Sequence, residues 1–292
     1  MHWLDSHRPE RQALTMAQPF FWVDAFTSEV FTGNPAAVCP LNAWLDDSLL
    51  QKMAWQHGLS ETAFFVRTGE RRYHLRWFTP AIEVDLCGHA TLASAHVLFS
   101  ELGQVGDEVT FDSRGGPLVV RHTEKGRLSM DFPSRTAGVF QPPDRLAMAL
   151  RKVPDTVSLG PSCWLVVYPK AEDVRSLTPD HPALAAFKPG RFIVTAPGDE
   201  PGLDFVSRFF APDAGVPEDP VTGSAHCVLT PYWSARLRKG SLHAKQVSRR
   251  GGELWCTMAG DRVHIAGHAA TYLRGQIDFE PTHSGHPYGV GL

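Results

Sequence analysis

The chain has 292 residues, of which 43% are hydrophobic and 20% are charged, and its formal net charge is −3. This composition is typical of a globular protein large enough for two core-bearing units of about 130 residues each. The near-neutral charge gives no reason to expect nucleic acid or an anionic membrane as a partner. No apolar run approaches the roughly 20 residues of a membrane span. The sequence therefore predicts neither nucleic-acid binding nor membrane insertion.

The first 15 residues differ from the rest of the chain. They are polar and aperiodic, and they lack the uninterrupted apolar run of a secretory signal. We expect residues 1–15 to be a disordered leader, or an extension upstream of a true start at Met16. The five cysteines are an odd number scattered along a long chain, which does not suggest a disulfide framework. We therefore expect a reducing, cytoplasmic location.

The first half alternates short apolar runs with glycine turns. The segment 45–58 predicts a helix capped by Asp46 or Asp47 and ended by Gly58. The remaining runs predict strands around one helix rich in small residues, with the strands at 20–26, 36–41, 61–66, 71–79, 108–113, 117–122 and 127–133, and the helix at 88–102.

The second half follows a similar order. It predicts modest helices at 142–153 and 179–187, strands at 163–169, 191–197 and 203–212, a second small-residue helix from Gly223, and a hairpin that turns at Gly260 and Asp261. In both halves a strand, an acid and a glycine lead into the small-residue helix, and Gly88 and Gly223 lie about half the chain apart. We predict an α+β fold of two pseudo-symmetric halves, 16–133 and 134–292, each a mostly antiparallel sheet wrapped around its central helix.

The two helix starts are candidate ligand sites. The free N–H groups and the dipole at a helix N-terminus attract anions, and glycine at 88 and 223 lets a ligand approach the backbone closely. If the halves face each other, both helix starts would hold one small carboxylate-bearing metabolite. The alternative is ordinary capping and tight packing.

Three titratable residues accompany these loops. Glu61 directly precedes an apolar strand, and a partly buried carboxylate there would have a raised pKa suited to proton transfer. His89 lies inside the first turn of its helix, where the dipole favours neutral imidazole. Asp219 precedes Pro220 just before the second helix. A solvated acid or a simple cap is the alternative for each residue.

The cysteines and histidines near the two helix starts are candidates for metal or thiol chemistry. Cys87, His89, His226 and Cys227 could assemble a zinc site, but His226 and Cys227 are adjacent on one helix and point about 100° apart, so we expect no metal. Cys87 at a helix start could have a lowered thiol pKa and be reactive. The nucleotide loops GxxxxGK[ST] and GxGxxG are absent.

Five segments resemble the phenazine-biosynthesis (PhzF-like) isomerase family in the right order. They are VDAFTSEVFTGNPAAVC, LSETAFF, RWFTPAIEVDLCGHATLASAHVL, FFAPDAGVPEDPVTGSAHCVL and QVSRRGGEL. The resemblance runs from about residue 20 to 280. It implies the diaminopimelate-epimerase-like fold, with the active site between two halves and a last strand that returns to the first half. It also implies an isomerase without a cofactor, and a homodimer as an open possibility.

The resemblance assigns roles to individual residues. Glu61 matches the family's proton-shuttling glutamate, while His89 and Asp219 match residues that line the same pocket. Ser60, Gly88, Gly223 and Ser224 match positions that bind the substrate. In the related epimerases a cysteine stands at each helix start, whereas here the two positions hold Cys87 and Thr222. Because a threonine hydroxyl cannot replace a thiolate base, a single-base isomerase is favoured.

The sequence is also compatible with two other functions. One is a ligand-binding or regulatory protein that keeps the cleft without catalysis. The other is a cysteine-dependent epimerase or dehydratase that uses Cys87.

Overall fold

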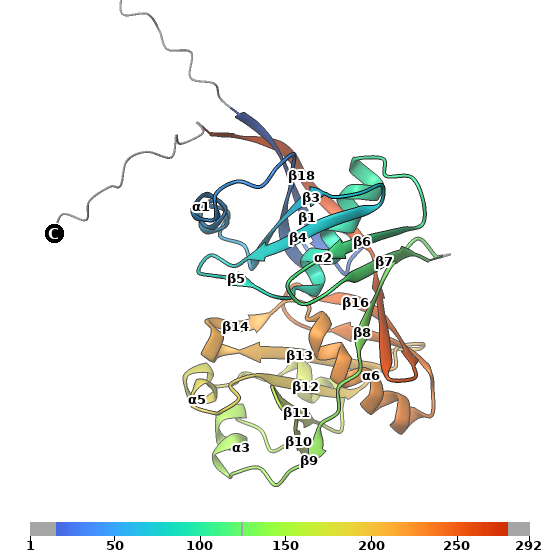
Figure 1. Ribbon diagram of the computed structural model, residues 1–292. Helices are drawn as coiled ribbons and strands as arrows, with labels where there is room; N and C mark the ends of the chain where they lie inside the picture. The colour runs from blue at the N-terminus through green and yellow to red at the C-terminus, as the bar shows by residue number, and fades with distance from the viewer. Residues whose placement is uncertain (1–15, 124, 280–292) are drawn as a thin grey trace, which may run out of the picture.

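The computed structural model describes residues 16–123 and 125–279. The predicted leader, residues 1–15, lies outside the described residues. Two halves lie one above the other in Figure 1, and each is a mixed sheet around one central helix. No helix among the described residues is long and apolar enough to cross a membrane.

The upper half surrounds helix α2 (Gly88–His96), which continues as a π-helical segment at Val97–Glu101, and carries α1 (Asp47–His57) on its outside. Its strands are β1 (Met16–Ala25), β2 (Asn34–Leu41), β3 (Glu61–Arg67), β4 (Arg72–Phe78), β5 (Glu83–Val84), β6 (Glu108–Asp112), β7 (Leu118–His122), β8 (Leu128–Pro133) and β18 (Ala269–Phe279).

The lower half surrounds helix α6 (Gly223–Leu237). Its smaller helices are α3 (Arg145–Leu150), α4 (Ala171–Arg175), α5 (His181–Ala185) and a 3₁₀ turn at Pro212–Ala214. Its strands are β9 (Gly138–Val139), β10 (Thr156–Leu159), β11 (Trp164–Val167), β12 (Phe192–Pro197), β13 (Phe205–Ala211), β14 (Val216–Asp219), β15 (Ser241–Gln246), β16 (Gly252–Ala259) and β17 (Arg262–Gly267).

The two halves repeat one order of strand pairs. In the upper half β2–β3 and β4–β6 are parallel, and β3–β4, β6–β7 and β7–β8 are antiparallel. In the lower half β11–β12 and β13–β15 are parallel, and β12–β13, β15–β16 and β16–β17 are antiparallel. The predicted α+β class with two similar halves is confirmed.

The halves are joined through strands. β8 pairs antiparallel with β17, which makes the two sheets continuous. The next strand after β8 is β9, which pairs with β10 in the lower half. The next strand after β17 is β18, which returns to the upper half and pairs with β1 along its whole length. The described part of the chain therefore ends beside its first strand, β1 (Figure 1).

The central helices are buried on nearly all sides. Every residue from His89 to Ala95 is buried, as are most residues in the first three turns of α6. Such helices lack a polar face, and their alanine, glycine and serine side chains allow the sheets to approach closely. Their N-termini can therefore meet at the boundary between the halves.

Several local predictions need correction. Asp46 stands at the start of α1 but makes no capping hydrogen bond, whereas Gly58 ends the helix in the left-handed conformation as predicted. The helix predicted at 88–102 changes from α to π geometry after His96. The helices predicted at 142–153 and 179–187 are only six and five residues long. The hairpin at Gly260 and Asp261 is confirmed.

Candidate active site

The starts of α2 and α6 meet between the halves. Cys87 and Thr222 stand in extended conformation immediately before the helices, and Gly88 and Gly223 are the first helical residues. A Cβ built on Gly88 would lie 3.8 Å from the Cα of Gly223, and the reverse distance is also 3.8 Å. Because neither residue has a side chain, the space between the two helix starts stays open to a ligand.

Neither N-cap residue, Cys87 or Thr222, makes a capping hydrogen bond from its own side chain. The Thr222 hydroxyl, which could have capped α6, donates instead to Asp219 Oδ2. The first N–H groups of both helices thus remain available to an anion. This geometry agrees with the predicted pair of carboxylate-binding helix starts.

Glu61 and His89 face each other beside these helix starts. Glu61 begins β3 and His89 lies in the first turn of α2, and Glu61 Oε2 is 3.3 Å from His89 Nε2. The angle is not that of a hydrogen bond, and both buried atoms lack another hydrogen-bond partner among the described residues. Catalytic pairs often tighten only when substrate is bound.

Burial sets the protonation of this pair. It raises the pKa of Glu61 to about 7, and the charge of Asp219 adds to the rise. Burial also lowers the pKa of His89 to about 4, so the imidazole is neutral near pH 7. Neutral His89 was expected from the helix dipole, but the cause here is loss of solvent.

Asp219 lies on the opposite side of the same site, at the end of β14. Burial raises its pKa to about 6, although hydrogen bonds from Thr222 and Asn34 oppose the rise. Gln246 holds the loop below it: its Nε2 donates to the Asp219 carbonyl at 2.7 Å, and its Oε1 accepts from the Thr222 N–H at 2.8 Å. Two acids with raised pKa values therefore flank the neutral imidazole.

Asn34 connects the two sides. Its Nδ2 lies 2.9 Å from Asp219 Oδ1, 2.9 Å from the Val221 carbonyl oxygen and 3.3 Å from His89 Nδ1. Sequence reasoning missed Asn34. The one signal for Asn34 was an amide in a Gly-Asn-Pro turn that opens an otherwise apolar strand.

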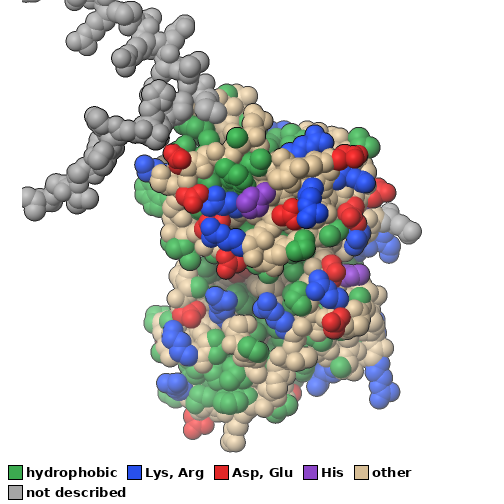
Figure 2. All heavy atoms as spheres, in the orientation of Figure 1, with side chains coloured by type: hydrophobic (Ala, Val, Ile, Leu, Met, Phe, Trp, Pro, Cys, Tyr) green, Lys and Arg blue, Asp and Glu red, His purple; other side chains and the backbone are tan. Residues whose placement is uncertain are grey.

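The remaining predicted residues, Ser60 and Ser224, are chain neighbours of site residues. Ser60 is half-buried directly before Glu61, and Ser224 is exposed in the first turn of α6. The surface is hollowed between the upper and lower halves (Figure 2). The structure thus brings five of the seven predicted site residues together between the halves, with His89 buried and Glu61 partly buried: Glu61, His89, Asp219, Gly88 and Gly223.

Burial disfavours the possibility that Cys87 is a reactive thiol. It raises the pKa of the thiol well above the usual value, and the negative charge of Glu61 adds to the rise. The Ala90 N–H at the helix start opposes the rise but is outweighed by burial. All five cysteines are buried and free.

A metal fits this cluster poorly. One ligand atom each from Glu61, Cys87 and His89 lies within 4.8 Å of the others, and within the described part of the chain these three form the only such group. A structural zinc site needs four ligands, one more than this group supplies, and a catalytic site with three ligands would need the Cys87 thiol to lose its proton at a buried position. The Nδ1 atom of His226, the other candidate zinc-ligand histidine, instead contacts the carbonyl oxygen of Thr222, the N-cap residue of its helix, at 2.8 Å.

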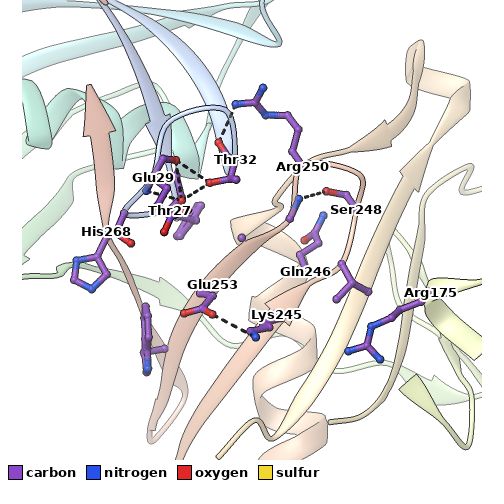
Figure 3. A pocket seen from close by; sticks show the side chains of 16 residues that line it. Thr27, Glu29, Thr32, Arg175, Lys245, Gln246, Ser248, Arg250, Glu253 and His268 are labelled. Carbon is purple, nitrogen blue, oxygen red and sulfur yellow. Dashed lines mark hydrogen bonds and ion pairs between the residues drawn. The ribbon is translucent and has the colours of Figure 1, made fainter. Parts of the chain in front are cut away.

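A cavity of about 580 Å³ lies beyond Gln246 from this site (Figure 3). Its lining includes Thr27, Arg175, Lys245, Ser248, Trp255 and His268. Glu61, His89 and Asp219 do not line it. Gln246 lies between this cavity and the Glu61 site, because it borders the cavity and also accepts a hydrogen bond from the Thr222 N–H.

The chain matches known proteins over nearly its whole length. The family model described as phenazine biosynthesis-like protein (PhzC-PhzF) matches residues 23–275. A Pseudomonas aeruginosa protein named as an uncharacterized isomerase is 51% identical over 262 residues, which covers 90% of this chain and 99% of the relative. The crystal structure of a PhzF family phenazine biosynthesis protein from Enterococcus faecalis has a TM-score of 0.86 at 44% identity, and covers 90% of this chain and 99% of that one.

More distant proteins share the fold alone. A hydroxyproline epimerase from Agrobacterium vitis is 10% identical with a TM-score of 0.56, over 91% of this chain and 94% of that one. The epimerase-like architecture predicted from the sequence is confirmed by this likeness. The chain belongs to the phenazine biosynthesis-like (PhzC-PhzF) family.

Proposed function

We propose that this protein is a cofactor-independent isomerase that moves a proton between carbons of a small carboxylated substrate. The observation that carries the proposal is the position of Glu61. Its carboxylate is buried, has a pKa of about 7, and faces neutral His89 at 3.3 Å. A group of this pKa can both accept and return a proton near neutral pH.

The reaction needs no oxidant or reductant. Ionised Glu61 takes a proton from one carbon of the substrate, and the C–H electron pair moves into the conjugated system toward the substrate carboxylate. The free N–H groups at Gly88 and Gly223 stabilise the charge that develops there. Protonated Glu61 then delivers the proton to a second carbon, which restores the carboxylate of Glu61.

The other named residues would bind and orient the substrate. His89 and Asp219 flank the reacting carbons, while Ser60 and Ser224 donate or accept hydrogen bonds at the open side. Asp219 also raises the pKa of Glu61 through its charge. This division of roles leaves the proton transfer itself to a single side chain.

The helix starts argue against a two-thiol epimerase. Cys87 and Thr222 hold equivalent positions before α2 and α6, so one of the two required thiols is absent. The remaining thiol is held protonated by burial. The name of the P. aeruginosa relative, uncharacterized isomerase, agrees with the proposal without naming a substrate.

The test is proton exchange from heavy water. A panel of small carboxylic acids with an acidic C–H, cyclic dienes included, is incubated with the protein in D₂O and followed by ¹H NMR. We expect incorporation into at least one acid, with a rate at least about 100-fold lower for Glu61→Gln. Full exchange by Glu61→Gln would contradict the role of Glu61, and saturable binding without exchange would support a binding protein instead.

A further inference from the structure

We propose that Asn34 is a positioning residue that fixes the proton of His89 on Nε2 and ties this imidazole to Asp219 across the two halves. The inference rests on the proposed function in one respect, that His89 and Glu61 form the proton-transfer pair. The arrangement of Asn34 itself follows from its contacts alone.

The orientation of the Asn34 amide is decided by a carbonyl group. The side-chain atom next to the Val221 carbonyl oxygen lies 2.9 Å from it, and a carbonyl oxygen can only accept. That atom must therefore be Nδ2, and its 2.9 Å contact with Asp219 Oδ1 agrees. An amide turned the other way would place its oxygen against two acceptors.

The same amide decides the tautomer of His89. The Nδ1 atom faces Asn34 Nδ2 at 3.3 Å and Cys87 Sγ at 3.5 Å. The amide nitrogen cannot accept a hydrogen bond, and its two hydrogens serve three acceptors, of which Asp219 and Val221 are the closer. A proton on Nδ1 would face this NH₂ group and could bond only the Cys87 sulfur, a weak acceptor, so the single proton of neutral His89 resides on Nε2.

This tautomer matters because Nε2 faces the carboxylate of Glu61. With a proton on Nε2, His89 donates toward Glu61 or toward a charged substrate oxygen. With the other tautomer, a lone pair would face a carboxylate in a buried site, which is repulsive. Asn34 thereby controls whether His89 supports the ionised form of Glu61.

The backbone around Asn34 is held from the opposite half. Gly33 has a φ of +67°, and a Cβ there would lie 2.3 Å from the Ala25 carbonyl oxygen, so only glycine fits. Arg250 donates to the Gly33 carbonyl at 2.8 Å, and the Gly33 N–H donates to the Gly251 carbonyl at 2.7 Å. Asn34 is completely buried. The amide therefore has little freedom to turn.

The test is direct observation of the His89 proton without substrate. Long-range ¹H–¹⁵N spectra of ¹⁵N-histidine-labelled protein distinguish the two tautomers, and a His89→Gln variant assigns the signal. We expect an Nε2–H tautomer in the wild-type protein. A wild-type Nδ1–H tautomer would overturn the proposal, whatever any variant does.

The variant Asn34→Asp provides a second test of the proposal. It keeps the shape of the side chain but sets a carboxyl oxygen against His89 Nδ1, Asp219 Oδ1 and the Val221 carbonyl oxygen. When this carboxyl is ionised, we expect the proton of His89 to move to Nδ1 or the ring to become charged. The matched control is Asn42→Asp, the same change at an exposed asparagine, which should keep the wild-type tautomer. An Asn34→Asp protein that folds and keeps the Nε2–H tautomer at a pH where ¹³C NMR shows residue 34 ionised would also overturn the proposal.

Turnover separates positioning from substrate binding. For any acid that exchanges in D₂O, we expect Asn34→Asp to lower kcat by at least about 100-fold while KM changes little. A rise in KM alone would contradict a positioning role. Because the tautomer is measured without substrate, its result is independent of whether the protein is an isomerase.

Discussion

Gly88 and Gly223 face each other across the boundary between the halves, and a Cβ on either would lie 3.8 Å from the Cα of the other. This is ordinary van der Waals contact, so each position has room for one methyl group. The space that the methyl would fill is the space between the two helix starts. The fold therefore tolerates alanine at either position, but the added methyl group would occupy space that a ligand bound between the helix starts needs.

Alanine at either position should therefore impair binding more than folding. We expect Gly88→Ala and Gly223→Ala to keep nearly wild-type unfolding free energy and to raise KM by about tenfold, equivalent to ~1.4 kcal/mol of lost binding. Chemical denaturation and steady-state kinetics measure the two effects. The control is Gly33→Ala, which meets the Ala25 carbonyl at 2.3 Å with a positive φ and should destabilise the fold by at least about 2 kcal/mol.

The buried charge of Glu61 should reduce stability. Its pKa is about 7 in the folded protein against an ordinary value of 4.5, so the native state binds more protons than the unfolded chain between these pH values. Wild-type stability therefore falls as pH rises from about 4.5 to 7. Glu61→Gln should be more stable than wild type at pH 8, on the order of 2 kcal/mol, and equal to it at pH 4.

Urea denaturation at both pH values checks this difference. Glu70→Gln, the same change at an exposed glutamate, should alter stability little at either pH. A Glu61→Gln protein that is less stable than wild type at pH 8 would show that the Glu61 carboxylate is stabilised in the fold.

The activity should follow the ionisation of Glu61. Because the base form is needed, kcat/KM should rise with pH up to about 7 and then level. The negative charge of Asp219 raises the pKa of Glu61, so Asp219→Asn should move the titration of Glu61 to lower pH. A ¹³C NMR titration of labelled glutamate measures this shift, and a shift to higher pH would contradict the coupling.

Arg250 should support the site from a distance. It pairs with the buried carboxylate of Asp24 at 2.8 Å and donates to the backbone of Thr32 and Gly33. Burial raises the pKa of Asp24, and the Arg250 charge opposes that rise. Removing the guanidinium leaves the buried carboxylate of Asp24 without its positively charged partner, so Arg250→Met should destabilise the fold by about 3 kcal/mol. It should also reduce activity, because Arg250 holds the backbone beside Asn34.

The neighbouring exposed Arg249 offers the matched control. Thermal unfolding of Arg249→Met should differ little from wild type. If both variants behave alike, the ion pair with Asp24 does not hold the loop that carries Asn34.

The features that repeat along the chain could be predicted from the sequence. The strand order and the acid-glycine-helix pattern recur in both halves, which was enough for the fold class and for the meeting of Gly88 and Gly223. The two ends of α1 were not equally predictable. Gly58 was predicted correctly as its C-terminal end, because glycine readily adopts the left-handed conformation that ends a helix. Asp46 was predicted as a cap, but an aspartate before a helix need not make the capping hydrogen bond.

Contacts between distant segments could not be predicted in this way. Asn34 reaches Asp219 across 185 positions, and Arg250 reaches Gly33 across 217. No local pattern records such a pairing. The pKa of Cys87 illustrates the same limit, because a helix start suggested a reactive thiol while burial and Glu61 determine the opposite result.

The most direct test of the account follows a labelled proton. A substrate identified by exchange is deuterated at the carbon that loses its proton, and it is turned over in H₂O. Because one side chain, Glu61, both takes and returns the proton in a buried site, we predict that part of the deuterium appears on the accepting carbon of the product, and that Cys87→Ser retains this transfer. Complete loss of the label to solvent, together with an inactive Cys87→Ser variant, would contradict the single-base account and favour catalysis by the thiol.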